Sequence, residues 1–318
     1  MKHIVNNEWG GKRLDLFVSE MLGITRAQAH KRIGRGAVLV NGVVPKKAGD
    51  IIKEGDEVAV IDALNARKQA GSNASAPAFG APFVVHEDPA YLVVHKPAGL
   101  LTHPTFADEP DTLSQWLVAR YPEIKTVGEN PRRPGIVHRL DREASGLLVV
   151  ARSQDAFFHL KKQFQSRTIE KEYTVLCYGV MEAEYGVIDF AIDRGKDGRM
   201  VARPKIGTLS LKTLRTAQEG KEARTEFWVE ERFARFTLLR VRIATGRTHQ
   251  IRVHLYAYAH PVVGDALYVN KKLIKRRDVL GRVFLHAHRL AFDNMQGDRV
   301  EYTAPLPQEL QSFLDQLK

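Results

Sequence analysis

The chain begins with a region whose apolar residues recur at helical spacing. Between residues 14 and 22 they occupy positions 14, 17, 18, 21 and 22, which lie on one side of a helix and predict an amphipathic helix. Thr25 is suited to cap a second helix that begins near Arg26. Apolar runs on either side of Asn41-Gly42 then predict a β-hairpin. Residues 11–62 therefore have the pattern of a small domain with two helices followed by strands.

Beyond residue 80 the pattern changes to short apolar runs separated by turn residues. They predict strands at residues 82–88, 91–100, 147–151, 172–178, 225–229 and 236–243, and helices at residues 112–120 and 153–165. Ser153 is the expected N-cap of the second of these helices. Strict alternation of strands and helices is absent, which argues against a parallel nucleotide-binding sheet and favours an α+β domain.

Small and polar residues dominate between these two parts, at residues 63–80, and no apolar period is visible there. Such a composition is typical of a flexible linker. We therefore expect one domain at residues 1–62 and a second at residues 81–318, and a chain of 318 residues is long enough for both.

Charge adds a hypothesis about the partner. Lys and Arg number 48 against 37 Asp and Glu, which gives a net charge of +11 and an isoelectric point near 9.7. This surplus favours a polyanionic partner, although charge alone gives roughly even odds between nucleic acid and a merely basic protein. The second predicted helix sharpens the hypothesis, because it contains no acidic residue and suits a phosphate backbone. Its basic residues are Arg26, Lys31, Arg32 and Arg35.

Other classes are excluded or disfavoured by composition. The single cysteine, Cys177, permits neither an intrachain disulfide nor a cysteine-rich metal site. No apolar run approaches membrane-spanning length, and the N-terminus has no apolar signal core. We therefore expect a cytoplasmic protein without a membrane partner.

One run concentrates candidate chemistry: His138-Arg139-Leu140-Asp141-Arg142-Glu143-Ala144-Ser145-Gly146. It places the Asp141 carboxylate between two arginines, which hold a carboxylate in the ionised state that a nucleophile requires. Without further information, an aspartate that caps a backbone amide in a turn would be the simpler interpretation.

The run resembles the signature His-Arg-Leu-Asp-x-x-Thr-Ser-Gly of the RluA-like pseudouridine synthases, which isomerise uridine to pseudouridine within RNA. The resemblance implies that Asp141 is the catalytic aspartate. It also implies a catalytic domain with a mixed, mainly antiparallel sheet. One position departs from the signature, since Ala144 stands where the family usually has Thr.

Further motifs extend this resemblance. Lys171-Glu172-Tyr173 is similar to the family's Lys-x-Tyr segment, which implies that Tyr173 lies against the target base and assists proton removal. Residues 246–252 match the family's Gly-Arg-Thr-His-Gln-Ile-Arg at every position, which implies that Arg252 pairs with the catalytic aspartate. The resemblance also implies that Arg247 and His249 contact RNA or structure their loop. It implies that Leu285 is an apolar wall of the uracil pocket, and that Arg139 fills the space left by the extruded base.

The order of elements over residues 11–62 resembles the alpha-L (S4-type) RNA-binding domain. The alternative is a small basic domain that binds protein or only folds. A chain of this family with an added alpha-L domain resembles the bacterial enzymes that modify the RNA of the large ribosomal subunit. We therefore expect 23S ribosomal RNA as the substrate, with transfer RNA as the alternative. We expect a monomer.

Competing functions find less support. The Gly-x-Ser-x-Gly elbow and the phosphate-loop lysine motif are absent, and the histidines have no metal-binding spacing, so no metal or organic cofactor is expected. A non-catalytic RNA-binding ribosome-assembly factor remains an alternative, although it would not need Asp141, Tyr173 and Arg252. A nucleic-acid hydrolase would need a metal or a second carboxylate, for which only Glu143 is near Asp141 in the sequence.

Overall fold

The chain forms two compact units, Met1–Ala76 and Pro77–Lys318, in this computed structural model. The structure describes residues 2–34, 37–60, 80–105, 109, 111–195, 198–203, 220–269, 272–273 and 280–318. Arg35 and all but the last residue of the predicted linker 63–80 lie outside these ranges.

The N-terminal unit contains both predicted helices, α1 (Leu14–Leu22) and α2 (Arg26–Gly34). The Thr25 hydroxyl accepts a hydrogen bond from the Gln28 amide at 3.3 Å, while the Gln28 side chain accepts one from the Thr25 amide at 2.8 Å, so α2 has the predicted cap. The two helices share a core with an antiparallel sheet of β1 (Lys2–Ile4), β3 (Glu57–Val60) and β2 (Val38–Val40), in that order.

The predicted hairpin around Asn41-Gly42 is wrong as a pair of strands. The turn itself forms, with both residues at positive φ, but beyond it only a single bridge joins Val40 to Val43, and β2 pairs with β3 instead. The physical reason is exposure: Val43 is 68% exposed and Val44 39%, so the second arm buries no apolar face. Pro45 follows and cannot donate to a ladder.

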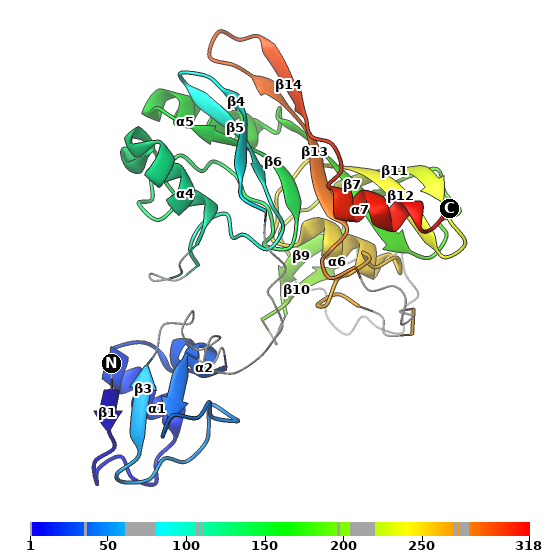
Figure 1. The fold of residues 1–318 in the computed structure, drawn as a ribbon. Coiled ribbons are helices and arrows are strands. Elements are labelled where there is room, and N and C mark those ends of the chain that lie inside the picture. Colours follow the sequence, from blue (N-terminus) through cyan, green and yellow to red (C-terminus); the bar gives the residue numbers. More distant parts are fainter. Residues whose placement is uncertain are drawn as a thin grey trace. The chain divides into compact units, whose positions relative to one another are not determined.

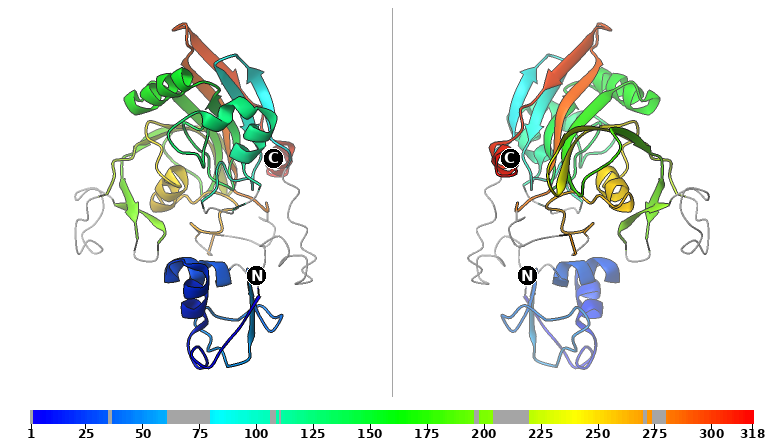
Figure 2. Two further views of the ribbon diagram at one scale, coloured as in Figure 1. Left: turned by 90° about the vertical axis from the view of Figure 1, so that its left-hand side faces the viewer. Right: turned by 90° about the vertical axis from the view of Figure 1, so that its right-hand side faces the viewer.

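The C-terminal unit is built on a nine-stranded sheet in which eight strands follow the order β4-β5-β6-β13-β7-β12-β11-β8, and β14 pairs with β13 (Figure 1). Only β6 and β13 are parallel; the other described pairs are antiparallel. The sheet is strongly twisted (Figure 2). The predicted α+β fold with a mixed, mainly antiparallel sheet is confirmed. The strands are β4 (Phe83–Glu87), β5 (Tyr91–Lys96), β6 (Ser145–Ala151), β7 (Glu170–Tyr178), β8 (Tyr185–Ile188), β11 (Thr225–Arg232), β12 (Phe236–Ile243), β13 (Leu285–Asp293) and β14 (Arg299–Thr303). A separate hairpin consists of β9 (Ala191–Arg194) and β10 (Met200–Arg203).

Helices cover both faces of this sheet. Leu148 and Val150 of β6 share a core cluster with α4 (Leu113–Arg120) and α6 (Gln250–Ala257). The alternate residues of β6 pack with α5 (Gln154–Ser166), and α7 (Gln308–Asp315) contributes to a further cluster. A short 3₁₀ helix, Pro122–Thr126, follows α4. The predicted Ser153 cap is present, since its hydroxyl accepts from the Ala156 amide at 3.2 Å. In the described ranges, none of the helices has both the length and the apolar character that a bilayer crossing requires.

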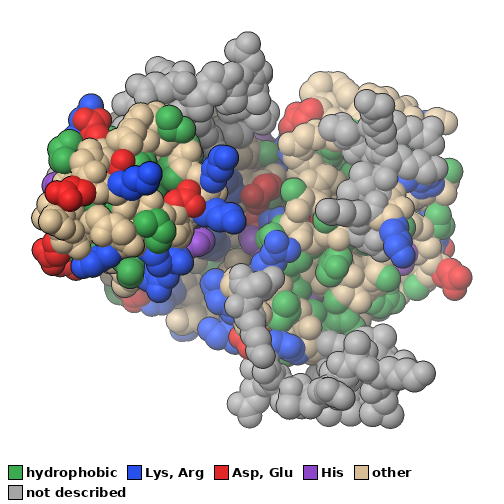
Figure 3. Space-filling model, turned by 90° about the horizontal axis from the view of Figure 1, so that it is seen from below, with side chains coloured by type: hydrophobic (Ala, Val, Ile, Leu, Met, Phe, Trp, Pro, Cys, Tyr) green, Lys and Arg blue, Asp and Glu red, His purple; other side chains and the backbone are tan. Residues whose placement is uncertain are grey.

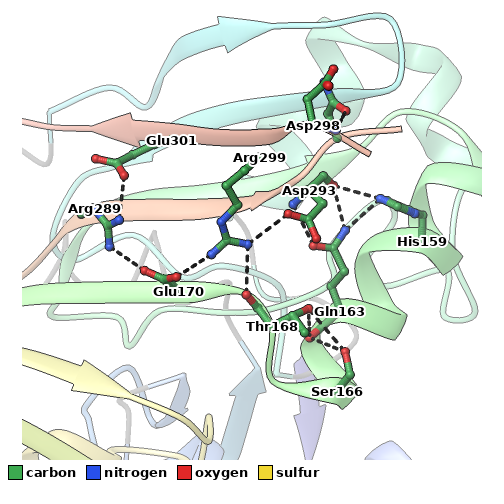
Figure 4. A network of polar contacts seen from close by, with 11 residues as sticks. His159, Gln163, Ser166, Thr168, Glu170, Arg289, Asp293, Asp298, Arg299 and Glu301 are labelled. Atoms are coloured by element: carbon green, nitrogen blue, oxygen red, sulfur yellow. Dashed lines mark hydrogen bonds and ion pairs between the residues drawn. The ribbon is translucent and has the colours of Figure 1, made fainter. Parts of the chain in front are cut away.

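A polar network ties the β13–β14 hairpin to α5 and to the first residue of β7 (Figure 4). The Glu170 carboxylate accepts hydrogen bonds from Arg289 at 3.0 Å and Arg299 at 2.8 Å, and Arg289 also pairs with Glu301. On α5, the Gln163 amide donates to the Asp293 carbonyl at 2.8 Å. The network fixes the beginning of β7, the strand that carries Lys171 and Tyr173.

Candidate active site

Asp141 lies in the loop that leads into β6, with its side chain 14% exposed. The loop is held from two sides. The Ala144 amide closes a turn on the Asp141 carbonyl at 3.2 Å. The Thr102 hydroxyl donates to the Leu140 carbonyl at 3.0 Å and accepts from the Leu140 amide at 3.3 Å. The backbone on both sides of Asp141 is therefore fixed by one backbone hydrogen bond and by the Thr102 side chain.

A buried lysine holds the same loop from beneath. Lys96, the last residue of β5, is fully buried, and its ammonium donates to the carbonyls of Pro97 (2.8 Å), Leu100 (2.9 Å) and Ala144 (2.7 Å). The pKa of Lys96 is lowered to about 7, mainly because the side chain is buried; the nearby Arg282 acts in the same direction, and the Asp141 charge opposes both. One ammonium thus joins the end of β5 to the loop of Asp141. The sequence alone predicts no role for Lys96.

Gly146 explains why the signature ends in glycine. Its φ is +121°, and a Cβ atom there would lie 2.3 Å from the Ala287 carbonyl oxygen of β13. Only glycine allows the parallel strands β6 and β13 to approach so closely. Ala144, the departure from the signature, is buried in the core beside Leu140, where a methyl group needs no hydrogen-bond partner.

Arg252 comes from α6, 111 residues after Asp141, and the fold brings the two together. Its Nη1 atom donates to Asp141 Oδ2 at 3.4 Å and to Glu143 Oε2 at 3.1 Å. The Arg252 side chain is only 3% exposed, so its charge is compensated by protein groups and not by water. The guanidinium lies between two carboxylates of the signature loop and one deeper in the protein.

The deeper carboxylate is Asp265, which sequence reasoning missed as a functional candidate. Its side chain is fully buried and accepts two hydrogen bonds from Arg252. Arg252 Nε donates to Asp265 Oδ2 at 2.6 Å, and Arg252 Nη2 donates to Asp265 Oδ1 at 2.9 Å. The amides of Leu267 and Tyr268 donate to its Oδ1 atom at 2.8 and 3.0 Å. Burial opposes the charge of Arg252, but the hydrogen bonds and charge of Asp265 raise its pKa above the ordinary value.

Tyr173 of β7 faces the same core and is 5% exposed. Burial raises the pKa of its phenol, and the charge of Asp141 raises it further. Among the described residues its hydroxyl has no hydrogen-bond partner, although the ring packs in the cluster that contains Leu285. Tyr173 at pH 7 is therefore a neutral phenol with a free hydroxyl and an apolar wall beside it.

Three further predicted residues surround this centre. Arg139 is exposed, and the described residues give it no ion pair. Arg247 donates from Nε to the Glu222 carbonyl at 3.0 Å. His249 hydrogen-bonds through Nδ1 with the Tyr268 hydroxyl at 3.0 Å, and burial lowers the pKa of His249. Arg139, Tyr173 and Arg247 line one cavity of about 440 Å³.

Comparison with known proteins gives the family. Residues 90–257, just over half of the chain, match the sequence profile of the RNA pseudouridylate synthase family, and residues 12–58 match the S4 domain. This chain belongs to the RluA-like family of RNA pseudouridine synthases. The predicted family and the predicted S4-type domain are confirmed, and the enzyme is an isomerase that acts on RNA.

Relatives cover nearly the whole of this pseudouridine synthase. The "Uncharacterized RNA pseudouridine synthase YlyB" of Bacillus subtilis is 33% identical, over 98% of this chain and 96% of its own. The "Ribosomal large subunit pseudouridine synthase D" of Neisseria meningitidis serogroup B is 34% identical, over 98% of this chain and 80% of its own. The solved structure of human "RNA Pseudouridylate Synthase Domain Containing 1" has 28% identity and a TM-score of 0.56, covering 71% of this chain and 84% of that one.

In the S4 domain of this pseudouridine synthase, the predicted basic helix α2 has one acidic neighbour, on α1. Arg26 is 55% exposed but pairs with Asp15 of α1 at 3.1 Å, so the helix is not free of carboxylate neighbours. Lys31 is exposed and Arg32 half-buried at the end of α2, while Arg35 lies outside the described residues. On the face seen in Figure 3, acidic and basic side chains are interspersed on this unit, at the left of the view.

Proposed function

We propose that this enzyme isomerises uridines of 23S ribosomal RNA and that Asp141 is its nucleophile. The observation that carries the proposal is the pairing of Asp141 with the buried Arg252, next to the buried phenol of Tyr173. A guanidinium held by Asp265 can orient the Asp141 carboxylate and compensate its charge where little water reaches it.

The reaction exchanges one glycosidic bond for another. Uridine is extruded from the RNA, at a cost of a few kcal/mol, and its N1–C1′ bond breaks. Asp141 either attacks C1′ or assists departure of uracil through a glycal-like intermediate, and both routes use the same ionised carboxylate. Uracil rotates and forms the C5–C1′ bond, after which the hydrogen on C5 leaves as a proton and N1 gains one. Atoms and electrons balance without an oxidant, reductant or co-reactant.

The neighbouring side chains suit the remaining tasks. Tyr173 offers a flat face for uracil and a neutral hydroxyl that can relay the C5 proton. Leu285 supplies an apolar wall, because it is buried in the same core cluster. Arg139 is exposed at the cleft and long enough to occupy the space left by the extruded base.

Support for the ribosomal substrate comes from relatives and from the S4 domain. Several relatives that match nearly the whole of this chain are named "Ribosomal large subunit pseudouridine synthase D". We assign contacts with the RNA phosphate backbone to the basic residues of α2 and to Arg247 and His249 in the loop before α6. The basic residues of α2 are Arg26, Lys31 and Arg32. Arg35, which lies outside the described residues, is proposed for the same role. A monomeric state and a cytoplasmic location remain predictions.

Tritium release from carbon-5-labelled uridine tests the proposal. Unmodified 23S and transfer RNA transcripts are incubated with the wild type, Asp141→Asn and Glu143→Gln in the presence of a chelator. We expect release from 23S RNA by the wild type and by Glu143→Gln, and none by Asp141→Asn. Glu143 is a matched control, because its carboxylate also contacts Arg252 but is 45% exposed.

Turnover by Asp141→Asn would refute the nucleophile. Release only from transfer RNA would refute the ribosomal substrate and favour a tRNA-directed enzyme. RNA binding without release from either transcript would favour the assembly-factor alternative, and RNA cleavage that the chelator abolishes would favour a hydrolase.

A further inference from the structure

Many arginines of the C-terminal unit, from exposed to buried, are paired with carboxylates. Arg152 contacts Glu123 at 2.7 Å, and Arg282 contacts Glu309 at 2.7 Å. The same holds for Arg224, Arg232, Arg240, Arg242, Arg252 and Arg289. A group of cations without such partners is therefore a departure from the way this protein handles positive charge.

Such a group lines the cavity of about 440 Å³. The cavity lies between residues 133–139, the end of α5, the beginning of β7 and residues 243–247. None of its lining residues is acidic, and five are cationic: Arg133, Arg139, Arg167, Lys171 and Arg247. Within the described residues only Arg167 of these five has a carboxylate partner, the exposed Glu222 at 3.0 Å.

Lys171 is the cation that most clearly lacks a counter-charge. Its ammonium lies 5.2 Å from the centre of the Phe164 ring, and the part of the chain that the structure describes offers it neither a carboxylate nor a hydrogen-bond acceptor. Burial lowers the pKa of Lys171 to about 8. A charged group withdrawn from water needs an anion or acceptors nearby, so an anion in the cavity would stabilise the ammonium.

His103 supplies a second, independent sign of a missing ligand. Its Nδ1 atom is one of the few buried side-chain polar atoms without a partner among the described residues, and the side chain lines the same cavity. The pKa of His103 is lowered to about 4, mainly because the side chain is buried and in smaller part by the charges of Arg139 and Arg133, so the imidazole is neutral at pH 7. A neutral imidazole can hydrogen-bond with a phosphate oxygen or a ribose hydroxyl.

We propose that this cavity binds a backbone phosphate of the substrate RNA, together with the nucleotide next to the extruded uridine. The volume lies within the range of small-molecule sites. Arg139 and Tyr173 belong both to the cavity wall and to the candidate active site. A group bound in the cavity would therefore lie next to the target uridine, as the neighbouring nucleotide of the same RNA strand does. This inference rests on the proposed RNA substrate and adds Lys171, Arg133 and His103 to its contacts.

Salt dependence of RNA binding gives the first test. The affinity for the 23S transcript is measured against salt for the wild type, Lys171→Met, Arg133→Gln and the control Arg132→Gln, whose arginine is also exposed and lies outside the cavity. We expect each cavity variant to bind on the order of tenfold more weakly and to lose about one from the salt slope. Arg132→Gln should keep the wild-type slope. Lys171→Met should melt no lower than the wild type, because methionine removes a buried charge.

Methylphosphonate substitution locates the phosphate. Single phosphates within a few nucleotides of the target uridine are replaced one at a time by neutral methylphosphonates. We expect one position at which the neutral substitution weakens RNA binding by the wild type but does not weaken RNA binding by Lys171→Met any further. Equal salt slopes for the cavity variants and Arg132→Gln would overturn the proposal. So would a Lys171→Met variant that melts lower than the wild type and keeps wild-type RNA affinity.

Two controls separate binding of an RNA phosphate from binding of free phosphate, and separate this inference from the proposed function. Inorganic phosphate alone should raise the melting temperature of the wild type, relative to Lys171→Met, by less than the 23S transcript does; an increase as large as that with the transcript would make the cavity a free-anion site and the RNA assignment wrong. Tritium release by the same wild-type preparation reports the proposed function separately. Loss of salt slope without release would leave the phosphate site standing and refute the isomerase substrate.

Discussion

Replacing Asp265 by asparagine should loosen the centre of the candidate active site. Asparagine keeps the size of the side chain and one carbonyl oxygen, which can still accept from the Leu267 and Tyr268 amides. It loses the negative charge, and its amide group faces Arg252 Nε, where the wild type has a 2.6 Å hydrogen bond. Two donors then meet at a site that water does not reach.

The magnitude follows from the contacts that remain. Removing one member of a buried ion pair costs about 3–5 kcal/mol. Arg252 still contacts Asp141 and Glu143, so the lower end of about 3 kcal/mol is expected. In a unit the size of Pro77–Lys318, each kcal/mol lowers the melting temperature by about 2–4 °C, which gives a decrease of roughly 6–12 °C.

Calorimetry measures this decrease, and single-turnover isomerisation measures its consequence. We expect a reduced rate with little change in RNA affinity, because Arg252 orients Asp141 rather than the RNA. Glu143→Gln is the control: its carboxylate is largely exposed, so its melting temperature should stay close to that of the wild type. An Asp265→Asn variant that melts within about 2 °C of the wild type and isomerises normally would refute the view that this pair positions the site.

Other expectations concern the loop and the core around it. Lys96→Met leaves three carbonyl oxygens without their donor and should destabilise the protein by about 2–3 kcal/mol in urea unfolding while lowering the turnover rate; a stable, fully active variant would contradict the tether. Gly146→Ala places a methyl group 2.3 Å from a carbonyl oxygen and should cost about 3 kcal/mol or more, whereas Gly246→Ala, with no atom within 4 Å, should be tolerated. Burial lowers the pKa of His138 to about 3, and its Nε2 atom accepts from the Val149 amide at 3.0 Å. Because an unfolded histidine titrates near 6.5, acidification protonates the unfolded chain first, and stability should fall by about 2 kcal/mol between pH 7 and pH 5 for this residue. Urea unfolding at the two pH values checks this, and a His138→Gln variant that shows the same loss would exclude His138 as its source.

Local features of this protein could be predicted from its sequence, because they depend on residues close together in the chain. The α1 and α2 helices and the caps at Thr25 and Ser153 follow from spacing and side-chain chemistry within a few residues. The family and the identity of Asp141, Tyr173 and Arg252 as candidates follow from motifs that are also contiguous. The prediction of a hairpin around Asn41 was wrong, because turn propensity does not determine whether the residues after the turn bury an apolar face.

The tertiary structure decided which of these candidates meet and what holds them. Arg252 contacts Asp141, which lies 111 residues away in the chain, and Asp265 accepts a hydrogen bond from Arg252 although the sequence alone predicts no role for Asp265. Lys96 became a tether only when β5 brought its ammonium to the carbonyls of a loop nearly fifty residues away. The sequence by itself determined the local elements, the family and the catalytic candidates. Pairings, burial and the cation-lined cavity required the fold, because the energy of a buried charge depends on the neighbours that folding supplies.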